Sequence, residues 1–346
     1  MTQWGPQAVQ RELITAVEQS LLLLLGQAAQ VPLELRASPR AERLHQRLAR
    51  ELSRPQRLLR LVALLDSIHQ LLCSGRHANP REIYYRHVTL FQRQQLSDGL
   101  VKSLCQTLEV PRHYLRLVGT AKGLVRGHLR ILEPKLGQDE SVWVDGMDPL
   151  EPRGHSISPL SAHVLQMQTV AQKVFVVEKE TVFHSLIDQG FLEKQKPCVL
   201  VTARGFPDVP SRYFLRRLQE TCASDFFLLV DFDPSGLAIA ATYGFGPEAG
   251  SWMQDDLTLR AMPLFCPGGV QGARPFGLKA SDVLPLTRRD RAVALNLQKR
   301  LKKLQSQGSK QVLDAYQEAL QQLLEKGQKY ELDAVERLPE FIAHLL

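Results

Sequence analysis

Acidic side chains follow two apolar segments of the chain, at the point where each segment ends. Glu178 comes directly after residues 173–177, and Asp231 and Asp233 follow the run 226–230. In an open α/β sheet the carboxyl ends of neighbouring parallel strands meet at one edge, and alternation along an extended chain puts both aspartates on one side. Crowded carboxylates raise one another's pKa values unless a cation neutralises them, and oxygen ligands favour Mg²⁺ or Mn²⁺. The three acids therefore predict a divalent-cation site, with helix capping and surface turns as the alternative.

A second group of reactive residues contains two tyrosines. Tyr84 and Tyr85 lie beside Arg81, Arg86 and His87. A phenol can attack a phosphodiester, but with a pKa near 10 only about a thousandth of it is ionised at neutral pH, so attack needs a nearby cation or base. Arg81 lies four residues before Tyr85, one turn away on the same face of a helix. The spacing indicates a nucleophilic tyrosine with an assisting arginine; the alternative is a buried aromatic pair with a packing arginine.

Positive charge is concentrated around these tyrosines. Residues 51–136 contain fourteen Lys and Arg against six Asp and Glu, whereas the whole chain has a net charge of +7. Concentrated positive charge favours a polyanionic partner, because each neutralised phosphate releases condensed counterions. The pattern favours nucleic acid as the partner, with a merely soluble basic surface as the alternative.

Several classes of site are not supported by the sequence. The five cysteines are scattered and form no Cys-x-x-Cys pair, so neither a zinc site nor a disulfide framework is indicated. The longest aliphatic run, residues 21–25, is too short to span a bilayer, and we expect a soluble intracellular chain without a membrane partner. The motifs of P-loop ATPases, serine hydrolases and dinucleotide-binding folds are absent.

The first fifty residues are expected to form an N-terminal helical extension. Residues 7–25 have apolar positions at helical spacing, and the leucines at 21–25 widen the apolar stripe nearly all the way round. Such a helix needs a partner, either the core of its own chain or another subunit. Residues 36–54 are polar and indicate a flexible link or an exposed helix.

Residues 51–136 are expected to form a winged helix-turn-helix domain. Four helices are predicted: one over 55–73, a short one that starts at Pro80, one from Ser97 to about Leu108, and a short one that starts at Pro111. Strands are predicted over 117–118 and 127–131, around a turn at 122–123. The helices and a β-ribbon would make the winged domain, whose wing would lie on DNA. The alternative is a plain helical bundle.

Residues 166–346 are expected to form a parallel α/β domain. Residues 137–165 are rich in Gly, Pro, Asp and Ser and are expected to be an interdomain linker. Strand, helix and strand patterns then alternate, and from residue 286 on the chain is mostly helical. The predicted fold class is therefore mixed α/β. The alternating segments are 173–177, 180–189, 198–202, 210–221 and 226–230, with a further helix after Pro234.

Six motifs, in this order and with compatible spacing, resemble those of the meiotic DNA double-strand-break transesterases, the sporulation-eleven family, and of the related A subunit of topoisomerase VI. The resemblance covers about residues 55–335. The motifs are residues 81–85 (REIYY), 119–127 (GTAKGLVRG), 177–180 (VEKE), 202–208 (TARGFPD), 230–236 (VDFDPSG) and 284–290 (LPLTRRD).

The resemblance implies a winged-helix domain that carries the tyrosine and a Toprim domain that carries the metal. Tyr85, the second of the pair, matches the nucleophile, and Arg81 would assist it. The implied ligands of Mg²⁺, or of Mn²⁺, are Glu178, Asp231 and Asp233. The residues in motifs that contact or position DNA are Lys122, Arg126, Arg204 and Phe206.

The implied function is a topoisomerase-like transesterase that makes meiotic double-strand breaks through a 5′-phosphotyrosyl link and so initiates homologous recombination in the nucleus. The implied partners are double-stranded DNA, a second copy of the chain, other recombination proteins and a B-type topoisomerase VI-like subunit. The alternatives are the A subunit of a type IIB topoisomerase that reseals its breaks, a Toprim nuclease or primase, and a non-catalytic DNA-binding protein.

Overall fold

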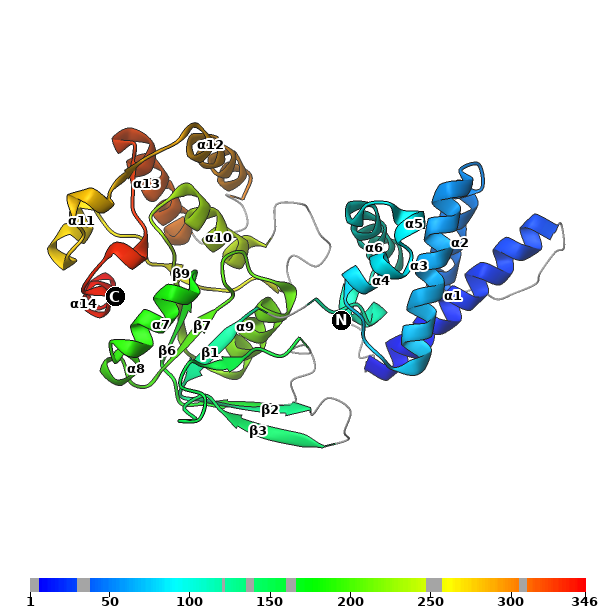
Figure 1. Cartoon of the computed structure of the whole chain (residues 1–346), viewed down its shortest axis with the longest axis horizontal. Coiled ribbons are helices and arrows are strands. Elements are labelled where there is room, and N and C mark those ends of the chain that lie inside the picture. The colour runs from blue at the N-terminus through cyan, green and yellow to red at the C-terminus, as the bar shows by residue number, and fades with distance from the viewer. Residues whose placement is uncertain are drawn as a thin grey trace. The chain divides into compact units, whose positions relative to one another are not determined.

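The computed structural model describes residues 6–29, 38–119, 122–134, 140–159, 166–246, 257–304 and 310–346. The chain divides into two compact units, residues 1–120 and 121–346, and each has its own hydrophobic core (Figure 1). The helices of the first unit are α1 (Pro6–Ala29), α2 (Pro39–Glu51), α3 (Pro55–Ser74), α4 (Pro80–Arg86), α5 (Val88–Phe91) and α6 (Gln94–Leu108), followed by a 3₁₀ turn over Arg112–Leu115.

Local signals fix where the helices of the first unit begin and end. The Ser38 side chain accepts a hydrogen bond from the Ala41 N–H and caps α2, and α3 ends at Gly75, whose φ of +68° suits glycine. A capping box between Asn79 and Glu82 starts α4. The helix that carries the tyrosine pair therefore begins at a fixed point.

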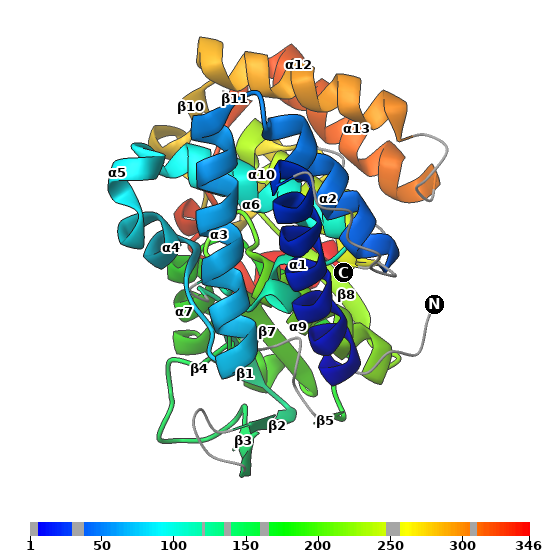
Figure 2. The same cartoon turned by 90° about the vertical axis from the view of Figure 1, so that its right-hand side faces the viewer.

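The apolar stripe of α1 is used within its own unit. Leu13, Ala16 and Val17 are buried, and α1 lies beside α2 and α3 (Figure 2). The Ser20 hydroxyl donates to the Ala41 carbonyl at 2.9 Å. The helix predicted over 7–25 is confirmed, and residues 39–51 form a helix with a buried face.

The ribbon predicted over residues 117–131 is not formed. Leu117 makes a single bridge with Ala78, and the described residues of the first unit contain no strand ladder. Residues 124–127 instead pair with residues 199–202 in the second unit. The strand predicted over 127–131 overlaps a strand over Leu129–Pro134, but that strand pairs with residues 141–145 and 166–169 of the second unit, so the wing expected here is not formed.

The described strands of the second unit form a six-stranded sheet, a three-stranded sheet and a two-stranded ribbon, in the orders β4-β1-β7-β6-β8-β9, β3-β2-β5 and β10-β11. In the large sheet β6 pairs in parallel with β7 and β8, β8 pairs in parallel with β9, and β1 and β4 are antiparallel. The strands are β1 (Leu124–Gly127), β2 (Leu129–Pro134), β3 (Ser141–Asp145), β4 (His155–Ser156), β5 (Gln166–Thr169), β6 (Lys173–Val177), β7 (Cys198–Thr202), β8 (Asp225–Leu229), β9 (Met262–Pro263), β10 (Leu284–Pro285) and β11 (Gln328–Lys329).

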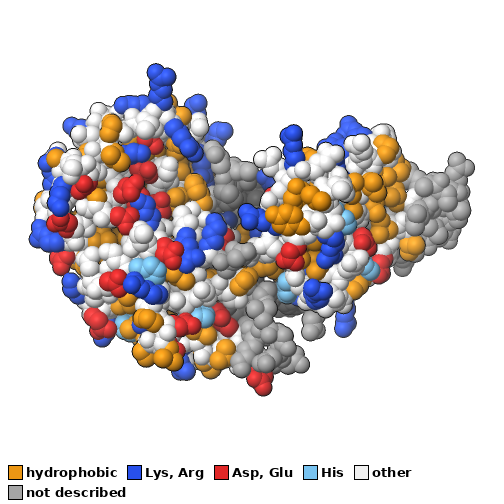
Figure 3. Space-filling view, viewed as in Figure 1, with side chains coloured by type: hydrophobic (Ala, Val, Ile, Leu, Met, Phe, Trp, Pro, Cys, Tyr) orange, Lys and Arg blue, Asp and Glu red, His pale blue; other side chains and the backbone are white. Residues whose placement is uncertain are grey.

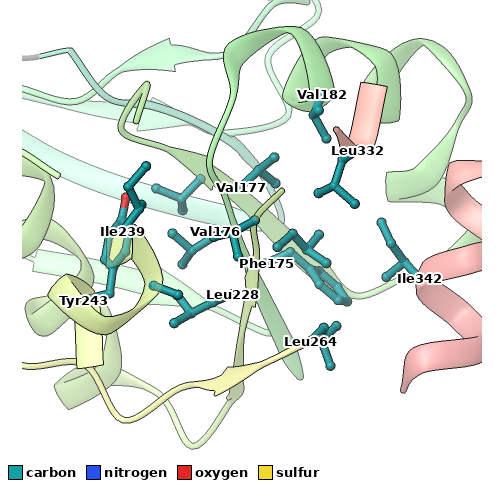
Figure 4. Packing of buried hydrophobic residues seen from close by; sticks show 14 of the residues in the cluster. Phe175, Val176, Val177, Val182, Leu228, Ile239, Tyr243, Leu264, Leu332 and Ile342 are labelled. Carbon is teal, nitrogen blue, oxygen red and sulfur yellow. The ribbon is translucent and has the colours of Figure 1, made fainter. Parts of the chain in front are cut away.

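Helices cover both faces of the large sheet. Val176 and Leu228 pack towards Ile239 on one face, and Phe175 lies towards Ile342 on the other (Figure 4). Because the central strands are buried on both faces, they are continuous apolar runs rather than alternating ones. The helices are α7 (Glu180–Asp188), α8 (Phe191–Lys194), α9 (Val209–Thr221), α10 (Pro234–Phe245), α11 (Val270–Ala273), α12 (Arg288–Lys303), α13 (Lys310–Lys326) and α14 (Leu338–Leu345).

Part of the segment expected to be a linker belongs to the second unit. Within residues 137–165, β3 pairs with β2 and β4 pairs with β1. Gly127 has a φ of +134°, and a Cβ on it would lie 2.5 Å from the Cys198 carbonyl oxygen. This glycine therefore permits the close approach of β1 to β7.

The net charge of the chain lies in the first unit. Residues 1–120 contain sixteen Lys and Arg against nine Asp and Glu, and the remainder contains twenty-seven of each. On the face shown in Figure 3, acidic and basic side chains of the second unit are interspersed. Within the described residues, no helix is both long and apolar enough to cross a membrane.

We expect the stability of the second unit to depend on pH through His155. Its Nδ1 lies 2.9 Å from Glu151 and its Nε2 3.3 Å from Glu133, and hydrogen bonding to Glu133 raises the pKa of His155. The interactions of protonated His155 with these carboxylates stabilise the fold fully below about pH 6.5, the pKa of an unfolded histidine. This stabilisation is lost as pH rises through the higher pKa of His155 in the folded state. Urea unfolding at several pH values should show His155→Gln less stable than the wild type at pH 6, with the gap closing by pH 9. A gap independent of pH would contradict this.

Candidate active site

Glu178 lies directly after β6, at the carboxyl end of the parallel strands. Its N–H donates to the Leu229 carbonyl at 2.9 Å, and its Oε2 accepts the Asp231 N–H at 3.0 Å. Burial and then the charge of Asp231 raise the pKa of Glu178 to about 8. The end of β6 is therefore joined to the segment after β8. The charge of Lys179 lowers the pKa of Glu178, but by less than burial and Asp231 raise it.

Asp233 lies at the start of α10. Its Oδ1 accepts the Gly236 N–H at 2.6 Å, which caps the helix, and burial raises the pKa of Asp233. A Cβ on Gly236 would lie 2.4 Å from the Asp231 carbonyl oxygen and 3.0 Å from Oε2 of Glu178. Glycine at this position lets the first turn of α10 approach the acids. The helix-capping alternative thus holds for Asp233, but its cap lies at the same strand ends as Glu178 and Asp231.

Lys179 supplies the positive charge nearest to Asp231. Its Nζ lies 2.8 Å from Asp231 Oδ2, 2.9 Å from Glu331 Oε2 and 3.2 Å from Asp333 Oδ2. The other Asp231 oxygen accepts the Leu332 N–H at 2.8 Å. Burial raises the pKa of Asp231, and Lys179 offsets part of that effect. Sequence reasoning did not assign Lys179, although a lysine directly after the strand-end glutamate was a usable signal.

The donor chemistry fits a divalent cation, but the present side-chain arrangement is not that of a metal centre. Among the described residues, no group of three or more His, Cys, Asp and Glu side chains has an arrangement that could hold a metal ion. Glu178, Asp231 and Asp233 provide hard oxygen ligands, and the pKa of Glu178 is raised by burial and then by the charge of Asp231, both of which a bound cation would offset. The Lys179 ammonium already contacts Asp231, so a cation bound there would compete with it.

The loop after β7 is tied to Glu178. The Gly205 N–H donates to the Glu178 carbonyl at 2.8 Å, and Arg204 has a φ of +56°. The Arg204 guanidinium donates to Glu180 Oε1 at 2.6 Å, and Phe206 is 55% exposed. Two of the residues predicted to contact DNA therefore lie in a loop that is bonded to the Glu178 backbone, and Phe206 presents an aromatic side chain to solvent.

The other two residues predicted to contact DNA have different surroundings. Lys122 is exposed, and its backbone N–H donates to Asp208 Oδ2 at 2.9 Å. Arg126 donates from Nη1 to the carbonyls of Asp148 and Glu151 at 2.7 and 2.8 Å. These bonds give Arg126 a structural role, which the motif alone did not reveal.

Tyr85 lies in the first unit, near the end of α4. It is 67% exposed, and Arg81 is exposed one turn earlier on the same helix. Tyr84 is half-buried, packs against the core of the unit, and its hydroxyl lies 3.4 Å from the Gln92 carbonyl. The alternative of a buried aromatic pair therefore applies to Tyr84 and not to Tyr85.

Comparison with known proteins gives the family of this chain. A family model of the Toprim domain shared by Spo11 and the A subunit of topoisomerase 6 matches residues 173–344, and a type IIB DNA topoisomerase model matches residues 56–117. The chain is 32% identical over 278 residues to meiotic recombination protein SPO11-1 of Arabidopsis thaliana, covering 80% of this chain and 72% of that protein. The chain belongs to the family of Spo11 and the topoisomerase VI A subunits.

Two further members show how the coverage varies within this family. The chain is 38% identical over 194 residues to meiotic recombination protein SPO11-1 of Oryza sativa subsp. indica, covering 56% of this chain and 49% of that protein. It is 31% identical over 232 residues to the A subunit of DNA topoisomerase 6 of Arabidopsis thaliana, covering 66% and 51%. The chain thus spans about half the length of these two relatives.

The Toprim domain of this topoisomerase VI A/Spo11 member contains the three acids of the candidate cation site. Domains of this type bind divalent metals. The matched region also contains Lys179 and the acidic segment around residues 331–333. The tyrosine pair lies in the region matched by the type IIB topoisomerase model.

We expect Glu178→Gln to stabilise the chain in the presence of a chelator. A folded-state pKa of about 8 against an ordinary value of 4.5 means that stability falls as pH rises between these values. At pH 7 the isosteric amide should raise the free energy of unfolding by on the order of 3 kcal/mol, because each pKa unit corresponds to about 1.4 kcal/mol. Urea denaturation measures this.

The matched control for this prediction is Glu180→Gln, two residues further along. Glu180 is about two-fifths exposed in its side chain, and its carboxylate pairs with Arg204. Its replacement should change stability little, because ion pairs near the surface contribute little. Equal changes in both variants, or destabilisation by Glu178→Gln, would show that ionising the Glu178 carboxylate does not destabilise the fold.

Proposed function

We propose that this chain is a DNA-cleaving transesterase that makes meiotic double-strand breaks and thereby initiates homologous recombination. The observation that carries the proposal is the environment of Tyr85: it is 67% exposed on a helix with a capping box, in the unit that holds the net positive charge. The Arg81 guanidinium has no hydrogen-bond or ion-pair partner among the described residues. A phenol and a cation are thus available together to a phosphodiester.

The proposed reaction exchanges one phosphoester for another. The Tyr85 Oη bonds to the phosphorus, the bond from phosphorus to the 3′ oxygen breaks, and the tyrosine proton ends on the released 3′ hydroxyl. The product is a 5′-phosphotyrosyl link, and no water enters. Arg81 would stabilise the phenolate or the charge on the phosphate through charge-assisted hydrogen bonds.

The carboxylates of the Toprim domain are proposed to hold Mg²⁺, with Mn²⁺ as a substitute. Glu178, Asp231 and Asp233 would be the ligands, and the bound cation would supply Lewis-acid stabilisation and positioning of the DNA strand. Lys122, Arg204 and Phe206 are proposed to contact DNA, since they are at least partly exposed and two of them lie in the loop tied to Glu178. Arg126 is proposed to position the loop around residues 148–151 instead.

A two-fold dimer is proposed to be the active species. Tyr85 and the three acids lie in different units of one chain, so a tyrosine of one copy can act with the cation site of another. The further proposed partners are double-stranded DNA, other recombination proteins and a B-type topoisomerase VI-like subunit. The proposed location is on chromosomes in the nucleus, because relatives are named meiotic recombination proteins.

A second candidate function is that of a topoisomerase A subunit that reseals its breaks. The 31% identity to the A subunit of DNA topoisomerase 6 of Arabidopsis thaliana supports it. The two functions share the cleavage step and differ in whether the phosphotyrosyl link is reversed on the same DNA.

The test incubates the full chain, together with a B-type subunit, with end-labelled duplex DNA and Mg²⁺ or Mn²⁺, followed by denaturation with detergent. The proposal predicts protein attached to 5′ ends and 3′ hydroxyls that a polymerase can extend. Cut DNA without attached protein would contradict it and favour a nuclease. ATP-dependent relaxation of supercoiled DNA would favour the topoisomerase.

A further inference from the structure

The first unit contains a cavity between α2, α3 and α6. Its volume is about 510 Å³, which is in the range of ligand pockets. Four arginines line it, Arg47 and Arg50 from α2 and Arg57 and Arg60 from α3. Neither Arg81 nor Tyr85 lines this cavity, which we call the arginine pocket.

Positive charge dominates the arginine pocket. Residues 39–60 contain seven arginines and two glutamates, and one of these, Glu51, lines the pocket. Burial lowers the pKa of Arg47, Glu51 raises it, and the neighbouring Arg50 and Arg57 lower it. A ligand with several negative charges would relieve this repulsion among the guanidinium groups.

Arg47 and Arg60 are each tied to another helix of the unit, and Arg50 donates from Nε to the Gln46 carbonyl of its own helix at 3.2 Å. Arg47 Nη1 donates to Thr107 Oγ1 at 2.8 Å, and Arg60 Nε donates to the Leu90 carbonyl at 2.8 Å. Thr107 in turn donates to the Ser103 carbonyl at 3.0 Å. A guanidinium group has five N–H donors, so each of these arginines retains donors for a ligand. Side chains fixed in advance lose less entropy on binding.

The remaining lining residues favour a peptide over a phosphate backbone. Glu51 adds a carboxylate to the lining, and a carboxylate accepts hydrogen bonds from the N–H groups of a peptide but repels a phosphodiester backbone, which has no N–H donor. Leu96, which is 42% exposed, and Leu100 add an apolar wall from α6. A peptide with acidic and apolar side chains complements the arginines, Glu51 and the leucines together.

We propose that the arginine pocket is a docking site for an acidic segment of a partner protein, in which apolar side chains are spaced among Asp and Glu. Carboxylates of the segment bind Arg50 and Arg57 at the exposed side of the pocket and Arg47 and Arg60 further in. The apolar side chains pack on Leu96 and Leu100. The pocket contains none of the residues assigned to DNA cleavage, so this proposal holds whether or not the cleavage reaction does.

The test measures fluorescence anisotropy of a labelled synthetic peptide that repeats Asp, Glu and Leu, added to the full chain. The double variant Arg50→Glu/Arg57→Glu should bind it at least about tenfold more weakly, since hydrogen bonds to charged groups contribute about 1.5 kcal/mol or more. Both arginines are exposed, so the fold should be retained. The matched control is Arg11→Glu/Arg76→Glu, which makes the same charge change at exposed positions outside the pocket.

Three comparisons decide the result. Equal weakening in the control pair, or no measurable binding to the wild type, would overturn the proposal. A peptide of Asp and Glu without Leu should bind more weakly than the Leu-containing one; equal binding, or displacement by inorganic phosphate at matched charge, would indicate an anion site instead. The proposal would also be overturned if Arg50→Glu/Arg57→Glu lost binding to duplex DNA while the control pair kept it, and if the peptide did not compete with DNA. That result would assign the pocket to nucleic acid.

Discussion

Tyr85→Phe is expected to abolish the covalent adduct between protein and DNA. The variant keeps the ring and removes the only atom of the side chain that can bond to phosphorus. Adduct formation, measured with end-labelled duplex in the presence of Mg²⁺ and a B-type subunit, should fall by at least about 10³-fold, as expected when a nucleophile is deleted. Because Tyr85 is 67% exposed, its hydroxyl is not needed for the fold. Binding of uncut DNA should therefore change little.

The neighbouring tyrosine provides a matched control. Tyr84→Phe makes the same chemical change one residue earlier, on a half-buried ring whose hydroxyl lies 3.4 Å from the Gln92 carbonyl. Loss of so long a contact should cost little stability and leave the adduct intact. The assignment of the nucleophile would fail if Tyr85→Phe still formed the adduct, or if Tyr84→Phe alone prevented it.

The sequence predicted the central strands and the position of the acids well, for a physical reason. Strands β6 and β7 were predicted with the bounds that the structure shows, and β8 within one residue. These strands are buried on both faces, so each is an apolar run that ends sharply where the chain reaches polar surroundings. Glu178, Asp231 and Asp233 follow those ends and are therefore placed by the same pattern.

The sequence predicted the short edge strands poorly. Strand β1 pairs with β7, some seventy residues further along, and β4 has only two residues. Pairing between strands so far apart, or so short, leaves no periodic pattern of apolar residues in the sequence. The Gly, Pro and Ser content of residues 137–165 indicated a linker instead. One signal was present: Gly127 permits a backbone approach that a Cβ would block at 2.5 Å. A glycine between two strand patterns is therefore evidence for close packing as well as for a turn.

The surroundings of the acids could be predicted only in part. Glu331 and Asp333 reach Lys179 from more than 150 residues away along the chain, which no local motif encodes. The pKa values of all three acids are raised as the crowded carboxylates suggested, but burial is the largest cause for each of them and repulsion between carboxylates is a smaller one. The sequence pattern did not show that a lysine of the chain itself provides part of the missing positive charge. The competition between this lysine and a divalent cation can be measured without any assay of DNA cleavage.

Lys179→Met is expected to destabilise the chain in a chelator and to increase its response to Mg²⁺. The variant keeps the length of the side chain and removes the cation from Asp231, Glu331 and Asp333. Removing one partner of a buried ion pair costs about 3–5 kcal/mol; because the Lys179 side chain is 27% exposed, we expect a loss of about 2 kcal/mol. With no lysine to displace, added Mg²⁺ should recover much of this loss, so the melting temperature should rise more with Mg²⁺ in the variant than in the wild type.

Lys194→Met separates this effect from the general loss of a lysine. Lys194 pairs with Glu340, and the side chains of both are about half exposed. A surface pair of this kind contributes between 0 and about 1 kcal/mol, so this control should change stability little and leave the Mg²⁺ response unaltered. If Lys179→Met and Lys194→Met responded alike to chelator and to Mg²⁺, Lys179 would be an ordinary surface lysine and the cation would bind elsewhere. A larger Mg²⁺ response in Lys179→Met alone would mean that metal binding at these acids includes the release of Lys179 from Asp231.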